Sequence, residues 1–164
     1  MQVLPNGELR SYNWKSSLPQ KEESSVEPKD QLLVEHVTPA DQKKVDFPHV
    51  LPLSTVILDD NVFSQREILV WRYLATGCVV KNGGRLCGAS HFGILVPQQH
   101  VASEVTVELV AREKLMVKGA EHDANRIKID SEGVIWMVWV GDDIDDFKVF
   151  KMTIPANSVE IVRD

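Results

Sequence analysis

The seven residues Val134–Val140 are the most constraining stretch of this sequence, because every one of them is apolar (Val-Ile-Trp-Met-Val-Trp-Val). A run of this length, bounded by turn residues at 130–133 and by Gly141, is typical of a β-strand. Successive side chains of a strand point to opposite faces, so both faces of this strand need an apolar neighbour. We expect one face to fill a core and the other to meet another part of the protein or a partner.

The sequence around this strand continues in a β pattern. Residues 104–109 alternate between polar and apolar, and short Val- and Ile-rich runs follow at 115–117 and 127–129. The spacing of the apolar residues at 101–116 would also suit a helix, but the abundance of Val and Thr favours strands. Residues 101–164 therefore predict a small all-β unit.

The last strand of this unit is preceded by a proline-led turn. The segment from Pro155 to Val162 resembles the closing segment of Src-homology-3-like barrels, in which one turn of tight helix leads into the final strand. A tryptophan-bearing strand upstream, here with Trp136 and Trp139, is also in character. The resemblance implies a small β-barrel, and it places Pro155 on the surface that grips proline-rich peptides in that family. Ser158 stands where the family usually has a tyrosine, so the resemblance implies the fold more than the ligand.

Residues 63–77 predict the best helix of the chain. Ser64 is a suitable N-cap, Glu67 follows three residues later to complete a capping box, and Gly77 supplies a stop signal. We expect the buried face of this helix to consist of Ile68, Trp71, Leu74, Ala75 and Cys78.

A β-hairpin is predicted directly after the helix, because Asn82-Gly83 is the commonest two-residue hairpin turn. With this turn, Cys78 lies opposite Cys87 in a non-hydrogen-bonded pair, where side chains approach closely. A disulfide is not expected in a cytosolic protein, so the sequence favours two buried thiols.

Residues 1–50 predict an extended polar arm with short elements. Residues 15–30 are rich in Ser, Glu, Lys and Pro, which is the composition of a linker or a disordered segment. The expected architecture is therefore α+β and mostly β: an arm over 1–50, a helix-and-hairpin unit over 51–100 and a small SH3-like barrel over 101–164.

Composition excludes several classes of protein. No run of 18 apolar residues is present, which predicts no membrane span, and residues 1–7 lack the features of a signal peptide. We therefore expect the cytoplasm, or a virion if the protein is viral. The net charge is −6, and residues 101–164 alone carry 8 basic and 13 acidic groups. This acidity argues against a broad nucleic-acid surface on the C-terminal unit.

Two groups of side chains are candidate metal ligands. Cys78, Cys87, His91 and His100 offer two thiols and two imidazoles, a ligand set that zinc accepts, but they lack the close cysteine pair of ordinary zinc sites. A buried cysteine pair and two loop histidines are the favoured interpretation. The four aspartates of residues 142–146 would suit a hard cation, but a solvated charged loop is the ordinary explanation and the favoured interpretation. No cofactor is predicted.

A nucleic-acid alternative rests on the helix and the hairpin. A capped helix followed by a Gly-rich hairpin resembles the last helix and wing of a winged-helix DNA-binding domain. In that interpretation the phosphate and base contacts would come from Arg66, Arg72, Lys81 and Arg85. The preceding helix of that domain is not found, because Pro48, Pro52 and a β-branched run occupy its place.

The functional prediction is a non-enzymatic interaction or assembly subunit, for example a phage or viral structural component. The sequence has no phosphate loop, nucleophile elbow or paired metal-binding histidines, so no catalytic residue is assigned. We expect the arm to bind a partner protein or a second copy of the chain. Trp136, Trp139 and Pro155 are the predicted interface residues, because aromatic side chains dominate interface energetics.

Overall fold

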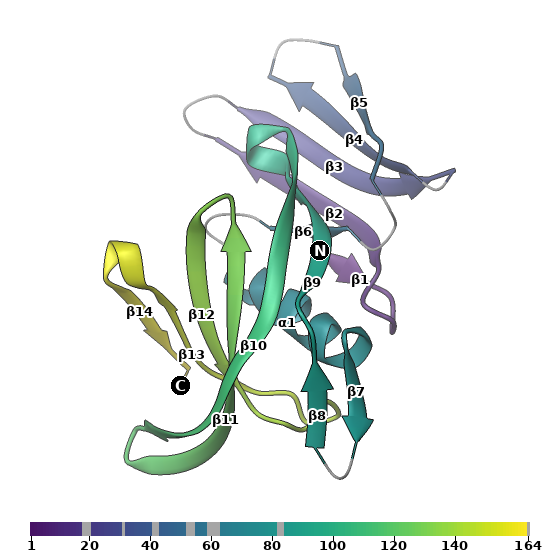
Figure 1. The fold of residues 1–164 in the computed structure, drawn as a ribbon. Helices are drawn as coiled ribbons and strands as arrows, with labels where there is room; N and C mark the ends of the chain where they lie inside the picture. The colour runs from purple at the N-terminus through teal and green to yellow at the C-terminus, as the bar shows by residue number, and fades with distance from the viewer. Residues whose placement is uncertain are drawn as a thin grey trace. The chain divides into compact units, whose positions relative to one another are not determined.

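The described part of the chain is mostly β, with one α-helix, two larger sheets and a two-stranded hairpin (Figure 1). The chain divides into two compact units: the first unit comprises Met1–Arg66 with Phe92–Ser103, and the second comprises Glu67–His91 with Glu104–Asp164. The computed structural model describes residues 1–17, 21–30, 32–40, 43–51, 55–58, 63–81 and 84–163.

The first unit contains a five-stranded antiparallel sheet, so the prediction of an extended arm over 1–50 is wrong. Its strands pair in chain order, and they are β1 (Gln2–Val3), β2 (Leu9–Ser16), β3 (Glu22–Lys29), β4 (Leu32–Pro39) and β5 (Val45–His49). The short strand β6 (Val56–Ile57) pairs in parallel with β9 (Ser90–Val96). The core of this unit is formed by Leu9, Tyr12, Val26, Leu33, Ile57 and Leu95.

The polar composition of this region is compatible with a sheet because few positions of each strand are buried. In β3, only Ser24 and Val26 are buried among eight residues. A strand that shows one face to water needs apolar residues on the other face alone. Residues 15–30 therefore have the composition of a linker, although most of those that the structure describes lie in strands β2 and β3.

Helix α1 (Ser64–Thr76) confirms the predicted helix over 63–77. Gly77 ends it, and a Cβ at this position would lie 2.7 Å from Ser90 Oγ and 2.9 Å from the Tyr73 carbonyl oxygen. The close approach therefore requires a glycine. The predicted buried face is wrong in part, since Ile68 and Trp71 are half-buried and Ala75 is exposed. The fully buried apolar side chains of α1 are Leu69, Val70, Tyr73 and Leu74.

The hairpin of β7 (Cys78–Lys81) and β8 (Gly84–Cys87) has the predicted register, with Cys78 opposite Cys87 and Lys81 opposite Gly84. The predicted turn at Asn82-Gly83 lies outside the described residues. The two cysteines form a disulfide, so the expectation of two thiols is wrong. Their Cα atoms are 4.2 Å apart, which is the close spacing of a non-hydrogen-bonded pair.

The second unit is built on an antiparallel meander. Its strands are β10 (Val101–Val117, of which 104–117 belong to this unit), β11 (Ala120–Ser131), β12 (Val134–Val140), β13 (Val149–Ile154) and β14 (Val159–Val162). The predicted SH3-like barrel is wrong, because the sheet is open: its strand order is β14-β13-β12-β11-β10-β9-β6. Closure of a barrel would require its two end strands to pair with each other.

The segment that suggested a barrel does have its predicted local form. Pro155–Asn157 is one turn of 3-10 helix, Ser158 follows with a left-handed φ of 52°, and β14 comes next. The same arrangement occurs at Pro97–Gln99, where His100 has a φ of 55° and β10 follows. The motif therefore connects two successive strands and does not specify closure. Within the described residues, no helix is long and apolar enough to cross a membrane.

Candidate functional site

The hairpin of β10 and β11 extends beyond the neighbouring strand. β12 pairs with β11 only over Asn125–Ser131, whereas β10 and β11 stay paired as far as Val117 and Ala120. The end of this hairpin therefore projects past β12 (Figure 1). Its turn is formed by Lys118 and Gly119, whose φ angles of 49° and 83° suit a two-residue hairpin turn.

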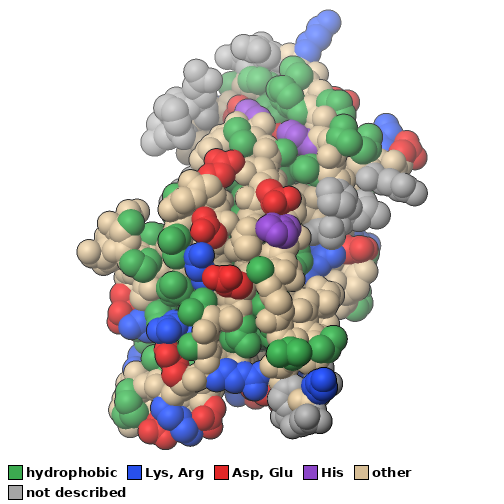
Figure 2. All heavy atoms as spheres, viewed as in Figure 1, with side chains coloured by type: hydrophobic (Ala, Val, Ile, Leu, Met, Phe, Trp, Pro, Cys, Tyr) green, Lys and Arg blue, Asp and Glu red, His purple; other side chains and the backbone are tan. Residues whose placement is uncertain are grey.

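Ion pairs connect the two strands of the projecting hairpin across its surface. Lys114 Nζ lies 2.7 Å from Asp123 Oδ1 and 3.5 Å from Glu121 Oε1. The hydrogen bond to Asp123 raises the pKa of Lys114, so this side chain stays charged. On the face drawn in Figure 2, acidic and basic side chains lie next to one another at this end of the molecule.

The connection between β12 and β13 leads into a residue that contacts this hairpin. Gly141 N–H donates a hydrogen bond to the Lys148 carbonyl oxygen at 2.9 Å, which closes the loop of residues 141–148. A β-bulge follows, since Val140 pairs with Val149 and Trp139 with Lys151. The bulge leaves Phe150 as the extra residue, and its ring stacks on His122 of β11 at 4.5 Å between ring centroids.

A hollow of about 510 Å³ lies between the hairpin end and this loop, and we call it the tip hollow. Its apolar and aromatic lining is formed by Val117, Ala120, His122, Phe147, Val149 and Phe150. Its charged lining is formed by Lys118, Asp146, Lys148 and Arg163. Among the described residues that line the hollow, three cations stand against one carboxylate, within a chain of net charge −6.

Two of the three cations of the tip hollow pair with neighbouring carboxylates, and all three are accessible to solvent. Lys148 Nζ lies 2.5 Å from Asp146 Oδ2, and the lysine side chain is 57% exposed. Arg163 lies 3.5 Å from Glu67 Oε2 of α1 and is 55% exposed. Lys118 is also exposed. Exposed pairs of this kind are weak, so Lys148 and Arg163 can exchange their present partners for a ligand at little cost.

The tip hollow continues into the face of the sheet that carries Trp139. Arg126 of β11 pairs with Trp139 of β12. His122 lies four residues before Arg126, so it is on the same face of β11. We call six residues of this side the outer face: His122, Arg126, Ile135, Met137, Trp139 and Phe150, all of them half-buried. The same side also carries half-buried polar side chains, which are Lys128, Asp130, Lys151 and Thr153. The opposite side of β12 is buried through Trp136, Val138 and Val140.

Neighbouring side chains fix the ring of Trp139 without burying it. The indole Nε1–H donates a hydrogen bond to Glu113 Oε1 at 2.7 Å, and Arg126 lies 3.4 Å from the other carboxylate oxygen of Glu113. Lys151 Nζ lies 5.3 Å from the ring centroid of Trp139, within range of a cation–π interaction. The ring is therefore presented in one orientation.

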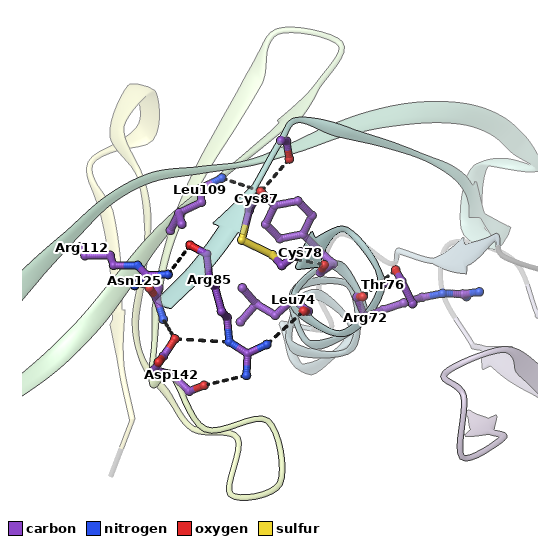
Figure 3. Close-up of a disulfide and its surroundings, with 12 residues drawn as sticks. Arg72, Leu74, Thr76, Cys78, Arg85, Cys87, Leu109, Arg112, Asn125 and Asp142 are labelled. Atoms are coloured by element: carbon purple, nitrogen blue, oxygen red, sulfur yellow. Dashed lines mark hydrogen bonds and ion pairs between the residues drawn. A yellow bond between two sulfur atoms is a disulfide. The ribbon is translucent and has the colours of Figure 1, made fainter. Parts of the chain in front are cut away.

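The disulfide-linked hairpin fixes the start of the 141–148 loop through Arg85 (Figure 3). The Arg85 guanidinium donates to the Leu74 carbonyl oxygen at 3.3 Å and to the Asp142 carbonyl oxygen at 3.1 Å. Its Nε also lies 3.3 Å from Asp142 Oδ1, an atom that accepts a further hydrogen bond from Asn125. Arg112 donates to the Arg85 carbonyl oxygen at 2.6 Å. One arginine thus joins the last turn of α1 to the loop.

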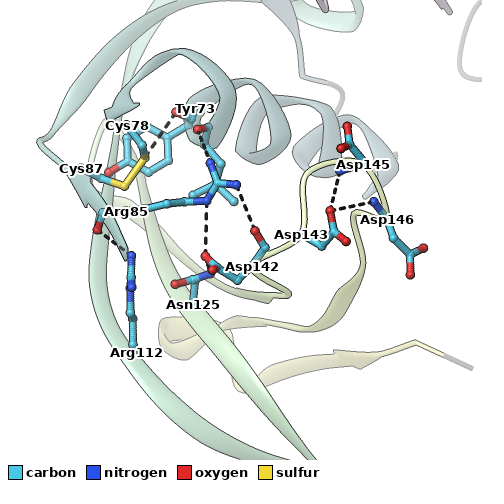
Figure 4. Close-up of polar contacts among 11 residues, drawn as sticks. Tyr73, Cys78, Arg85, Cys87, Arg112, Asn125, Asp142, Asp143, Asp145 and Asp146 are labelled. Carbon is cyan, nitrogen blue, oxygen red and sulfur yellow. Dashed lines mark hydrogen bonds and ion pairs between the residues drawn. A yellow bond between two sulfur atoms is a disulfide. The ribbon is translucent and has the colours of Figure 1, made fainter. Parts of the chain in front are cut away.

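The remaining aspartates of this loop form a turn (Figure 4). Asp143 Oδ1 accepts hydrogen bonds from the backbone N–H of Asp145 at 2.9 Å and of Asp146 at 3.3 Å. This is the ordinary use of an aspartate in a turn. No set of three or more His, Cys, Asp or Glu side chains suited to a metal ion is found in the described part of the chain.

Tyr73 connects α1 to both the hairpin and the sheet. Its hydroxyl donates to the Gly88 carbonyl oxygen at 2.9 Å and accepts from the Leu109 N–H at 2.8 Å. Burial raises the pKa of this hydroxyl, so it remains protonated and able to donate.

Two of the three predicted interface residues are accessible. Trp136 is 5% exposed and belongs to the core, Trp139 lies on the outer face, and Pro155 is exposed in the 3-10 turn before β14. The sequence did not single out His122, Phe147 or Phe150. The sequence pointed to these residues only indirectly: the strand Val134–Val140 is apolar on both faces and so required a second apolar surface, but the pattern did not show where that surface lies.

The residues of the nucleic-acid alternative do not form a basic surface. Arg66 is 5% exposed and Arg72 is 6% exposed, so neither guanidinium is presented to a nucleic acid. Arg85 is engaged with Leu74 and Asp142, and Lys81 is exposed. This placement does not favour DNA binding.

The candidate zinc ligands are not assembled into one site. Cys78 and Cys87 are consumed by the disulfide, and His91 lies in β9, not in a loop, 3.2 Å from both Glu104 and Thr106. His100 Nδ1 lies 3.0 Å from Glu35 Oε1 in the first unit.

The first unit contains a buried polar cluster that the sequence did not predict. Glu35 is fully buried, and its carboxylate contacts His100 Nδ1 at 3.0 Å, His49 Nε2 at 3.1 Å and Ser24 Oγ at 3.0 Å. Phe47 stacks on His100 at 5.4 Å. Both carboxylate oxygens have partners, which is the requirement for a buried charge. We interpret the cluster as structural.

No protein-family model, curated protein or solved structure matches this chain.

Proposed function

We propose that this chain is a non-enzymatic protein-interaction module that binds a partner through the outer face and the adjoining tip hollow. The observation that carries the proposal is that β12 is apolar on both sides, while only the side of Trp136, Val138 and Val140 is buried. Ile135, Met137 and Trp139 are left half-buried on the other side. A further protein surface would complete the burial of these side chains.

The composition of the outer face supports a protein partner. Aromatic residues and arginine are enriched at the centres of protein interfaces. Trp139 is held in place by Glu113 and Lys151, so less side-chain entropy would be lost when a partner covers its ring. Phe150 is similarly held by its stack on His122.

The proposed environment is an oxidising compartment in place of the expected cytoplasm. The support for this is the bond between Cys78 and Cys87, because cytosolic thiols are generally kept reduced.

A peptide-display selection against the purified chain tests the proposed function. We expect enriched peptides whose binding is lost in the Trp139→Ala and Phe150→Ala variants. Val134→Ala is the matched control, since Val134 is a 50% exposed apolar residue at the start of the same strand. The proposal fails if no peptide is enriched, or if the enriched peptides bind both aromatic variants as tightly as they bind the parent chain.

A further inference from the structure

We propose that the tip hollow receives an acidic segment of a partner protein, with one aromatic or large apolar side chain as its anchor. This inference rests on the proposed function and names the chemistry of the partner. It follows from the two kinds of lining that the hollow combines, an apolar floor and a basic rim.

The floor of the hollow requires an apolar anchor. Phe147 and Phe150 are half-buried, and Val149 beneath them is 3% exposed. The Phe150 ring is already stacked on His122 at 4.5 Å. An aromatic side chain entering the hollow would therefore meet a preformed aromatic surface, which favours offset or edge-to-face packing.

The rim of the hollow selects the charge of the segment around this anchor. Lys118 comes from the hairpin turn, Lys148 from the 141–148 loop and Arg163 from the segment after β14. Among the described lining residues, Asp146 is the only one with a carboxylate. A segment with carboxylates on both sides of its anchor would reach cations from separate elements. Such complementarity speeds the association of an acidic segment and disfavours a segment that carries positive charge.

A protein segment fits this hollow better than a small anion or a nucleic acid does. The cations are spread around the rim, and Lys148 and Arg163 already pair with Asp146 and Glu67, so the hollow does not form a tight anion cradle. A nucleic acid brings one phosphate with every nucleotide, which is more negative charge than three separate cations can neutralise. A short peptide has few charges and an apolar anchor, which matches both linings.

Fluorescence anisotropy titrations of the full chain test this inference. The probe is a labelled peptide with one central tryptophan flanked by two Asp or Glu residues on each side. Its controls are a peptide with Ser in place of the acids, a peptide with Lys in place of the acids, and the acidic peptide with Ala in place of tryptophan. We expect the acidic tryptophan peptide to bind most tightly, and its binding to weaken when salt is raised from about 0.05 to 0.5 M.

Charge-reversal variants locate the binding without disturbing the core. Lys118→Glu combined with Lys148→Glu changes two exposed side chains, and we expect it to weaken binding of the acidic peptide about tenfold or more. Phe150→Ala should weaken binding by at least about tenfold, as expected for an interface anchor. Lys21→Glu, an exposed lysine of the first unit, is the matched control and should leave binding unchanged.

The outcomes separate this inference from the proposed function. The inferred partner chemistry is wrong if the Ser-substituted peptide binds as tightly as the acidic peptide and the double lysine variant keeps its full affinity for the acidic peptide. In that case the display-selected peptides still test the proposed function. The inference is also overturned if a single-stranded oligonucleotide displaces the labelled acidic peptide at a lower concentration than the unlabelled acidic peptide does. It is overturned as well if the chain self-associates through these lysines, as seen by light scattering of the parent and the double variant. If neither the acidic peptide nor any display-selected peptide binds the parent chain, the inference and the proposed function are both refuted.

Discussion

Removal of the disulfide should destabilise the second unit by an amount set by the length of the hairpin. The double variant Cys78→Ser, Cys87→Ser deletes the bond, while two residues of similar size stay at the ends of β7 and β8. The cysteines are nine positions apart in sequence, so the bond closes a loop of about ten residues in the unfolded chain.

The magnitude follows from the entropy of that loop. Cross-linking a loop of about ten residues removes about 9 cal/mol/K from the unfolded chain, which corresponds to about 2.7 kcal/mol of folding free energy at 25 °C. The contacts of the hairpin in the folded state should largely persist, because Arg85 still bridges Leu74 and Asp142 and Tyr73 still bonds to Gly88. The loss of stability is therefore expected to come from the greater conformational entropy of the unfolded chain.

Urea denaturation followed by tryptophan fluorescence measures this effect. Trp71, Trp136 and Trp139 all belong to the second unit, so the signal reports mainly on its unfolding. With an ordinary urea dependence, the midpoint should fall by about 1 to 2 M. The parent chain treated with a dithiol reductant should unfold at the midpoint of the double variant, and its mass should increase by two hydrogen atoms.

The reasoning is refuted if the oxidised parent, the reduced parent and the double variant all share one midpoint. That result would mean either that the bond does not form in solution or that the unfolded hairpin stays closed without it. A mass for the untreated chain that corresponds to two free thiols would identify the first of these causes.

Three further predictions concern polar groups. Tyr73→Phe should cost about 0.5–1.5 kcal/mol, because it removes the hydroxyl that bonds to the part-buried Leu109 N–H and to the Gly88 carbonyl oxygen. Glu35→Ala should cost about 3–5 kcal/mol, because it leaves the partners of a fully buried carboxyl group unpaired, and Glu35→Gln should cost less. Hydrogen bonds to Asp46 and then Glu27 raise the pKa of His36, so its stabilising contribution is complete below the unfolded pKa near 6.5 and is lost as pH rises through the folded pKa. Urea midpoints measure the first two, and midpoints from about pH 5 to 9 measure the third.

Each of these predictions has an outcome that contradicts it. An unchanged midpoint for Tyr73→Phe would mean that the hydroxyl carries no net stabilisation. Equal stability of the alanine and glutamine variants of Glu35 would show that its hydrogen bonds are unimportant. For His36, the test variant is His36→Gln, which should abolish the loss of stability at high pH, and the prediction is wrong if the loss remains.

The elements that the sequence predicted best are those encoded by neighbouring residues. The helix start at Ser64, the stop at Gly77 and the pairing of Cys78 with Cys87 all follow from signals within a few positions. The buried side of the helix was predicted less well. Arg66 and Arg72 occupy buried positions that a search for apolar residues assigns to solvent.

Pairing between distant strands could not be inferred in the same way. In β3, Val26 is the only buried apolar residue, so nothing local separates this strand from a linker. The proline turn at Pro155–Asn157 was read correctly as a local structure, but the open sheet depends on the partners of β14 and β6, which that turn does not specify. Secondary structure depends on tertiary context wherever burial is sparse.

The candidate site was only partly visible in the sequence. The two-sided apolar pattern of Val134–Val140 correctly required a second apolar surface, and Trp139 was named as one of its anchors. Phe150 reaches the surface through a β-bulge, and His122 lies on a hairpin that projects beyond β12. A bulge and an overhang are consequences of register, which the pattern of single residues does not reveal.

The most direct test of the proposed function is to map where a bound peptide changes the backbone amide signals of the isotope-labelled chain by nuclear magnetic resonance. The peptide should be the tightest binder from the display selection, whatever its sequence. We predict that the shifted signals cluster at residues 117–122, 135–139 and 147–150, on the outer face and in the tip hollow. Shifts confined to the five-stranded sheet of the first unit, or no shifts at saturating peptide, would contradict the proposed function.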